Sequence, residues 1–298
     1  MLKEKNPIVV LGCGFLGRAV ASLFSSHGYS VFGLTRHPRT QEIIEENAAS
    51  SYSILNGDVT DCSSLELLLE KLPAQFSVIY SVSSGRGGSD AYASIYRDGL
   101  SHVLKIWKPR RVLFVSSTSV YGQVHGELVD ETSPTLPESP TSRILLEAEQ
   151  IALRYNGLVA RLSGIYGPGR SILLEKFLNG TAVLENGGDR FLNQIHRDDA
   201  ARALFFLLTE GEFSGIYNVT DDTPATQRTV YAWMAEVLDK PLPNIGPADL
   251  HKKRGWTSKR ISNEKLKSTG WVPNFRSYRD ALPSLLKERK ALPSEIKI

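Results

Sequence analysis

The sequence has little of what marks secreted, membrane or metal-binding proteins. Only two cysteines, Cys13 and Cys62, occur among 298 residues, too few for a disulfide framework or a cysteine-based metal site. No apolar run approaches the ~20 residues of a membrane span, and the opening MLKEKNP leads into a strand-like segment without a signal-peptide core. We therefore expect a cytoplasmic protein that needs no metal.

Net charge is also nearly absent. The chain has 35 Lys and Arg against 32 Asp and Glu, a balance of +3, and the two signs are mixed along most of its length. We expect neither nucleic acid nor a membrane as a partner, but a small-molecule substrate. Hydrophobic residues make up 41% of the chain and no segment is of low complexity, so the whole chain is expected to fold.

Short apolar, β-branched segments alternate with helical patterns along the first half of the chain. In the helical patterns apolar residues recur every three or four positions, as at Leu16, Val20, Leu23 and Phe24. This alternation predicts an α/β fold with a doubly wound parallel sheet, the Rossmann fold. The predicted strands are Ile8–Leu11, Ser30–Leu34, Tyr52–Leu55, Ser77–Val82, Arg111–Val115 and Leu158–Leu162.

After about residue 165, glycine and proline become more frequent and the alternation weakens. Two further helices are predicted at Asp198–Leu208 and Thr226–Leu238, and a last one near Ser277–Lys290, which Pro283 should delay or kink. We predict a smaller, discontinuous substrate-binding lobe. The expected boundaries are 1–165 with about 195–222 for the dinucleotide-binding domain, 166–194 with 223–290 for the lobe, and 291–298 for a tail.

The segment VVLGCGFLGRAV, residues 9–20, contains three glycines between a predicted strand and a predicted helix. Gly12 permits the tight turn, Gly14 lets the backbone approach a pyrophosphate, and Gly17 lets the helix pack against the strand. The helix N-terminus offers free N–H groups and a positive dipole end to the phosphates. This context predicts a dinucleotide site. Cys13, inside the turn, is interpreted as a small buried filler rather than a reactive thiol.

The end of the second predicted strand indicates which dinucleotide binds. An acidic residue there favours NAD, whereas an arginine fits the 2′-phosphate of NADP. The chain has Thr35 and Arg36 at this point, with Arg39 close by and no acid before Glu42. NADP(H) is therefore favoured over NAD(H), the alternative being that Arg36 is a solvated loop residue.

Asp58, in the segment NGDVTD after the third predicted strand, is placed to bind the adenine amino group. Asp61 in the same segment is expected to cap the next helix.

Several further segments resemble those of a known superfamily. They are FVSSTSVYG (114–122), ARLSGIYGPGR (160–170), IHRDDAARAL (195–204), YNVTDD (217–222) and KRISNEKLKSTGW (259–271). With the glycine turn, they resemble the extended short-chain dehydrogenase/reductases of the NAD-dependent epimerase/dehydratase type, and the last segment looks like the atypical branch.

The resemblance implies a cofactor across the carboxyl ends of the sheet, with Ser81 and Ser83 beside a ribose and Ser116 and Ser117 beside the nicotinamide. The cofactor-binding residues expected in all are Gly12, Gly14, Phe15, Leu16, Gly17, Arg36, Asp58, Val59, Ser81, Ser83 and Ser116.

Catalysis in that superfamily uses a Tyr-x-x-x-Lys pair, in which the lysine charge lowers the tyrosine pKa. Here the matching helix, 139–155, has Thr141 and Leu145 at these positions, or Ser142 and Leu146 one residue later, and no tyrosine in the chain has a lysine four residues on. Thr118 and Ser119 stand where the sugar-nucleotide dehydratases have an acid/base pair. A dehydratase of that kind is therefore not expected.

Two interpretations remain open. The protein is an oxidoreductase or epimerase with Tyr121 as acid and Ser117 as orienting donor, aided by Arg143 or His125, or it is a non-catalytic NADP(H)-binding sensor or scaffold. Tyr121 could equally only pack its own loop.

The lysine- and arginine-rich segment 251–267 includes Lys259. It suits a small anionic substrate, such as a nucleotide sugar or a phosphorylated metabolite, unless it is a solvated loop. His196 is expected to link the lobes. By analogy with the superfamily, the helical segments Asp90–Trp107 and Ser142–Tyr155 suggest a homodimer.

Overall fold

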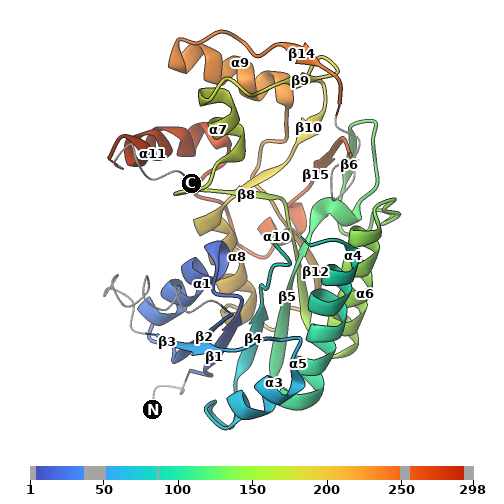
Figure 1. Ribbon diagram of the computed structural model, residues 1–298, viewed down its shortest axis with the longest axis vertical. Helices are drawn as coiled ribbons and strands as arrows, with labels where there is room; N and C mark the ends of the chain where they lie inside the picture. Colours follow the sequence, from blue (N-terminus) through green and yellow to red (C-terminus); the bar gives the residue numbers. More distant parts are fainter. Residues whose placement is uncertain (1–4, 37–51, 86, 249–255, 292–298) are drawn as a thin grey trace.

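The computed structural model describes residues 5–36, 52–85, 87–248 and 256–291 (Figure 1). Its centre is a seven-stranded sheet in the order β12-β7-β5-β4-β1-β2-β3, and every neighbouring pair is parallel. The strands are β1 Ile8–Leu11, β2 Val31–Thr35, β3 Ser53–Asn56, β4 Ser77–Tyr80, β5 Arg111–Ser117, β7 Leu158–Leu162 and β12 Gly215–Val219. The predicted α/β, doubly wound fold is confirmed. Arg39, Glu42 and residues 252–254 lie outside the described part.

Six of these strands lie within two residues of their predicted bounds, and the seventh, β12, was missed. It pairs with β7 from Gly215 opposite Leu158 to Val219 opposite Leu162. Its sequence GIYNV is short and contains Asn218, whose side chain is fully buried. A buried asparagine is tolerated because its amide is hydrogen-bonded, a contact that the local sequence does not reveal.

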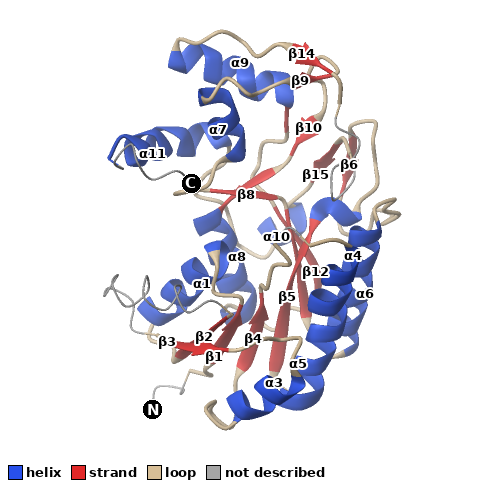
Figure 2. Cartoon of the chain, in the orientation of Figure 1, coloured by secondary structure: helices blue, strands red, loops and turns tan. Residues whose placement is uncertain are grey.

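Helices cover both faces of the sheet (Figure 2). On one face lie α3 Cys62–Leu69, α5 Gly99–Trp107 and α6 Pro140–Arg154, preceded by α4 Ser89–Tyr92 and a π-helical turn, Ala93–Asp98. On the other face lie α1 Phe15–Ser26 and α8 Arg197–Thr209. Side chains alternate along β1: Val9 and Leu11 join the first core, Ile8 and Val10 the second. Burial on both faces explains the apolar runs that predicted the strands.

A second lobe lies beyond the carboxyl ends of the sheet strands (Figure 1). Its helices α7 Ile172–Leu178, α9 Gln227–Leu238 and α11 Tyr278–Ala291 share an apolar core that includes Phe177, Tyr231 and Leu282. Helix α11 begins five residues before Pro283, so this proline lies inside the helix and does not delay its start.

The remaining elements are short. They are β6 Glu127–Val129, β8 Gly164–Tyr166, β9 Leu184–Glu185, β10 Phe191–Leu192, β11 Gln194–His196, β13 Ala225–Thr226, β14 Ile245–Gly246, β15 Lys259–Ile261, α10 Glu264–Lys267 and a 3-10 turn, Thr118–Val120. Most pair in twos, and β15 with β6 connects the second lobe to the segment that follows β5.

The glycines of the first turn differ in what surrounds them. Gly12 has a φ of 91°, and a Cβ there would lie 2.7 Å from the Ser81 carbonyl oxygen. A Cβ on Gly17 would lie only 2.1 Å from the Gly12 carbonyl oxygen. A Cβ on Gly14 would meet none of the described atoms within 4 Å. Gly12 and Gly17 are thus required by the fold itself, whereas the space at Gly14 is open to a ligand.

This difference predicts unequal effects of alanine on stability. Gly17→Ala should lower the free energy of unfolding by ~2 kcal/mol or more, because the methyl group overlaps backbone that cannot move freely. Gly14→Ala, the matched control, should cost less than ~1 kcal/mol, the scale of an unfavourable helix N-cap. Urea denaturation measures both, and equal losses would contradict the assignment.

Candidate functional site

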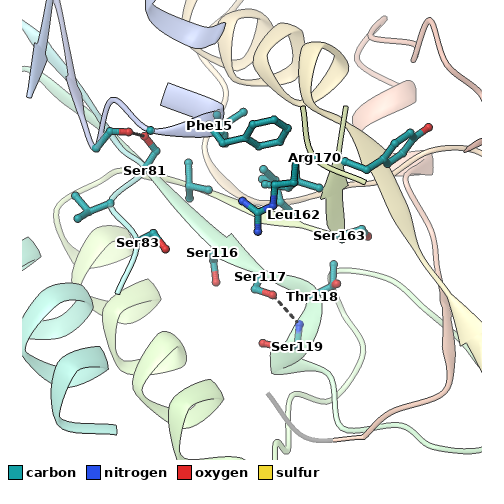
Figure 3. Close-up of a pocket in the computed structure, with 18 of the residues that line it drawn as sticks. Phe15, Ser81, Ser83, Ser116, Ser117, Thr118, Ser119, Leu162, Ser163 and Arg170 are labelled. Atoms are coloured by element: carbon teal, nitrogen blue, oxygen red, sulfur yellow. Dashed lines mark hydrogen bonds between the residues drawn. The ribbon is translucent and has the colours of Figure 1, made fainter. Parts of the chain in front are cut away.

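A cavity of about 660 Å³ lies between the carboxyl ends of the sheet and the second lobe. Its lining begins at the turn after β1 and passes the ends of β2, β4, β5 and β7. It continues to residues 190–194, Thr257 and Lys259. Figure 3 shows Phe15 on one side of this space and Ser116, Ser117 and Ser119 on the other. The cavity is therefore shared by the two halves of the molecule.

The structure places most of the predicted cofactor residues on this lining. They are Gly12, Gly14, Phe15, Leu16, Arg36, Val59, Ser81, Ser83 and Ser116. Gly17 and Asp58 do not line the cavity. Gly17 packs on the turn, as described above, and the Ser81 hydroxyl donates to the Leu11 carbonyl (3.0 Å), which ties the ends of β1 and β4 together.

Arg36 and Asp58 form an ion pair of 3.5 Å at the ends of β2 and β3. Burial alone would raise the pKa of Asp58, but hydrogen bonds from Thr60 and the charge of Arg36 hold it below its ordinary value. Asp58 thus faces Arg36 and Thr60, while Arg36 also lines the cavity. Arg36 is the residue that the sequence predicts to bind the 2′-phosphate of NADP. Its side chain is 42% exposed and its guanidinium is paired with Asp58.

Two smaller predictions concern Cys13 in the glycine turn and Asp61 before α3. Burial raises the pKa of the Cys13 thiol to about 12, so it is a filler of the interior and not a reactive group. Asp61 caps α3, since its carboxylate accepts from the Ser63 backbone N–H at 3.0 Å. Both predictions are confirmed.

Tyr121 is not where an acid would have to be. Its side chain is fully buried and absent from the cavity lining. Its hydroxyl accepts from Arg161 Nη1 (2.9 Å) and donates to Asn218 Oδ1 (2.9 Å), and burial raises its pKa. This burial favours the alternative in which Tyr121 packs its own loop. His125 and Arg143, its expected helpers, are exposed and do not line the cavity either.

A buried ion pair between Arg161 and Glu149 connects the Tyr121 hydroxyl to Ser116, which lines the cavity. The Arg161 guanidinium of β7 binds the Glu149 carboxylate of α6 at 2.6 Å, and the Ser116 hydroxyl donates to the same carboxylate at 2.5 Å. The Ser117 hydroxyl accepts from the Ser119 N–H at 3.2 Å (Figure 3). These bonds fix the residues that end β5.

The cavity lining also contains basic side chains. Arg170 lies over the Phe15 ring at 5.3 Å, and Arg190 donates to the Thr257 carbonyl at 2.8 Å and pairs with Glu185 at 3.7 Å. Lys259, only 3% exposed, also lines the cavity. Burial, together with the charge of Arg190, lowers the pKa of Lys259 to about 7, although Glu127 opposes the shift.

Lys259 was not singled out from its basic segment by the sequence. The pattern that could have identified it is the alternation of β15, where Lys259 and Ile261 are buried and Arg260 between them is exposed.

Ser163 adds a polar group without an internal partner. Its hydroxyl oxygen is buried, lines the cavity (Figure 3), and has no hydrogen-bond partner among the described residues. Buried polar atoms are rarely left unpaired, so this oxygen is suited to a ligand.

His196 has the structural role that was expected. Its ring caps α8, accepting from the Asp198 N–H at 3.3 Å, and packs against Phe275 of the second lobe with ring centres 3.9 Å apart. Burial lowers its pKa.

Two general findings complete the description of the chain. Within the described ranges, no three His, Cys, Asp or Glu side chains are arranged to hold a metal ion. None of the described helices has the length and apolar character required to cross a membrane.

The buried ion pair gives a prediction about stability. Glu149→Gln should lower the free energy of unfolding by ~3 kcal/mol or more, because it leaves the Arg161 charge uncompensated in the interior. Glu147→Gln is the matched control on the same helix, where an exposed pair with Arg97 (3.3 Å) contributes less than ~1 kcal/mol. Urea denaturation of both variants tests this, and a loss below ~1 kcal/mol for Glu149→Gln would contradict the account.

Comparison with known proteins agrees with this geometry. Residues 8–220 match the model of the NAD dependent epimerase/dehydratase family. Protein YeeZ of Escherichia coli K12 is 27% identical over 263 residues, 86% of this chain and 93% of that protein. A 3-diazoavenalumate denitrifying reductase of Streptomyces is 24% identical, covering 92% of this chain and 98% of the reductase.

A solved structure extends the likeness to the fold. The Thermus thermophilus UDP-glucose 4-epimerase in complex with NAD superposes with a TM-score of 0.79 at 20% identity, over 96% of this chain and all of that one. The family match covers well over half of the sequence. The chain belongs to the NAD-dependent epimerase/dehydratase family.

Proposed function

We propose that this protein is an NAD(P)(H)-dependent oxidoreductase or epimerase that prefers NADP(H) and acts on a small anionic substrate. One observation carries the proposal. A single cavity joins the glycine turn, Arg36 and Arg170, which lies over the Phe15 ring, to Arg190 and Lys259. Such a cavity suits a dinucleotide phosphate beside the first set of residues and a carboxylate or phosphate group of a substrate beside the second.

The residues present fit a bound dinucleotide. The open space at Gly14 and the N-terminus of α1 accommodate a pyrophosphate, and Ser116 and Ser117 line the cavity where the nicotinamide end would lie. When bound, the nicotinamide supplies or accepts a hydride. The protein's part is to hold the ring and the substrate together at the end of β5, and the unpaired Ser163 hydroxyl is available to orient a substrate.

The preference for NADP(H) rests on Arg36. The last residue of β2 is Thr35, so this strand does not end on a carboxylate that could bind the ribose 2′-hydroxyl of NAD. A 2′-phosphate would add negative charge beside a guanidinium that Asp58 already positions. The Thermus neighbour holds NAD, so cofactor choice is the part of the proposal that requires a direct test.

A second candidate function is a non-catalytic NADP(H)-binding sensor. It is favoured by the burial of Tyr121 and by the absence of Tyr-x-x-x-Lys from the sequence. Oxidation of bound NADPH by a carbonyl compound distinguishes an oxidoreductase from a sensor, and inversion of a substrate's stereocentre distinguishes an epimerase from a sensor. Domain boundaries, a homodimer and a cytoplasmic location stay predictions.

Cofactor choice is tested by Arg36→Ala. Loss of a charge-assisted contact of ~2 kcal/mol should raise the Kd for NADPH by ~30-fold, while the Kd for NADH changes by less than ~3-fold. Arg143→Ala, an exposed arginine of α6, is the control and should change neither. Calorimetric titration measures all four values, and equal losses for NADPH and NADH would refute the role of Arg36.

The pyrophosphate position is tested by Gly14→Val. The side chain would occupy the open space at Gly14, so both cofactors should fail to bind while the circular dichroism spectrum stays that of the wild type. Unchanged affinity would show that no pyrophosphate lies against this turn.

A further inference from the structure

The amine of Lys259 is brought to the end of β5 from the second lobe. Its Nζ donates to the Tyr121 carbonyl oxygen at 2.6 Å and to Thr257 Oγ1 at 2.9 Å. Tyr121 follows the turn that contains Thr118 and Ser119, and both of these residues line the same cavity as Lys259. Lys259 thus lines the same cavity as Ser116 and Ser117, which would face a nicotinamide, and its amine is bonded to the backbone just after the turn that follows them.

The hydrogen bonds leave one position on the nitrogen. A neutral amine has two N–H donors and one lone pair, and an ammonium has three N–H donors. The Tyr121 carbonyl and Thr257 Oγ1 accept two hydrogens in either state. The third position holds the lone pair of the amine or the remaining proton of the ammonium. Gain and loss of that proton leave both internal bonds intact.

The charges around Lys259 bring this change close to neutral pH. Among the residues that the structure describes, two charged groups act on the amine: Arg190, which precedes β10, and Glu127 of β6, the residue paired in register with Lys259. Burial and Arg190 lower the pKa to about 7, and Glu127 acts in the opposite direction. General acids and bases are most effective when their pKa is near the working pH.

We propose that Lys259 is the proton-transfer residue of this protein, in the role that the absent Tyr-x-x-x-Lys pair has elsewhere in the superfamily. This rests on the proposed function. In carbonyl reduction the carbonyl carbon gains the hydride supplied by NAD(P)H, and the C=O π bond breaks. The oxygen takes the third proton of the Lys259 ammonium, an O–H bond forms, and the neutral amine regains a proton from water. Oxidation of the alcohol reverses each step.

The protonation state of Lys259 can be measured without any substrate. In protein labelled with ¹³C-lysine, the Cε resonance absent from Lys259→Met is assigned to Lys259 and followed from pH 5 to 11. Its midpoint is expected near pH 7. Lys105 is exposed on α5 and lies outside the cavity lining. Lys105→Met is the matched control and should leave the Lys259 signal and its midpoint unchanged.

Activity is measured with 4-carboxybenzaldehyde, an aldehyde with an anionic group, in single turnovers with NADPH. Lys259→Met should slow the reaction by ~100-fold or more, the range of general acid catalysis, with NADPH affinity unchanged. The wild-type rate should fall as pH rises through about 7, because the ammonium is the donor. Lys259→Arg should be slow and lack this fall, and Lys105→Met should behave as the wild type.

The possible outcomes separate the two proposals. A wild type that fails to bind NADPH, or that binds it and never oxidises it with the aldehyde, overturns the proposed oxidoreductase and with it this role of Lys259. A protein that turns over while the Lys259 signal titrates only above pH 10, or whose Lys259→Met variant keeps the rate and the pH profile, overturns the role of Lys259 alone. Unchanged NADPH binding and an unchanged melting temperature in both Lys259 variants exclude misfolding as the cause of slow turnover.

Discussion

The ion pair between Glu149 and Arg161 is the interaction on which the floor of the cavity depends. It is buried, so each charge requires the other, and it joins α6 to β7. From it, one hydrogen bond reaches Ser116 at the end of β5, and another reaches the Tyr121 hydroxyl and so Asn218 of β12. The backbone of Tyr121 then accepts from Lys259 of the second lobe. Residues from four elements of the large domain and one of the lobe are thus fixed relative to one another.

The two proposals assign cofactor binding and proton transfer to different parts of the chain. The large domain supplies the glycine turn, Arg36 and the serines of β5, all of which suit a dinucleotide. Segments later in the chain supply Arg170, Arg190 and Lys259. By resemblance to the superfamily, the helix expected to provide its tyrosine and lysine has Thr141 and Leu145 at these positions, or Ser142 and Leu146. Lys259 is an ionisable residue on the cavity lining. Tyr121 has become part of the interior that supports that group.

Much of the fold could be predicted because the signals were local. The β-branched runs, buried on both faces of the sheet, reproduce six strands within two residues, and the turn of Gly12, Gly14 and Gly17 follows from backbone geometry alone. The site depended on contacts between distant segments. Arg161 lies forty positions after Tyr121 and Lys259 nearly a hundred after Arg161, so neither the burial of one hydroxyl nor the placement of one amine could be inferred. Lys259 also stands among other basic residues, and only its position in β15 distinguishes it.

The most direct test of the account is a crystal structure of the protein with NADPH. The account predicts a pyrophosphate against the turn from Gly12 to Phe15, a 2′-phosphate beside Arg36, and a nicotinamide ring between Ser117 and the Lys259 amine. A cofactor bound outside this cavity, or one whose nicotinamide lies away from Ser117 with Lys259 turned from the ring, would contradict it.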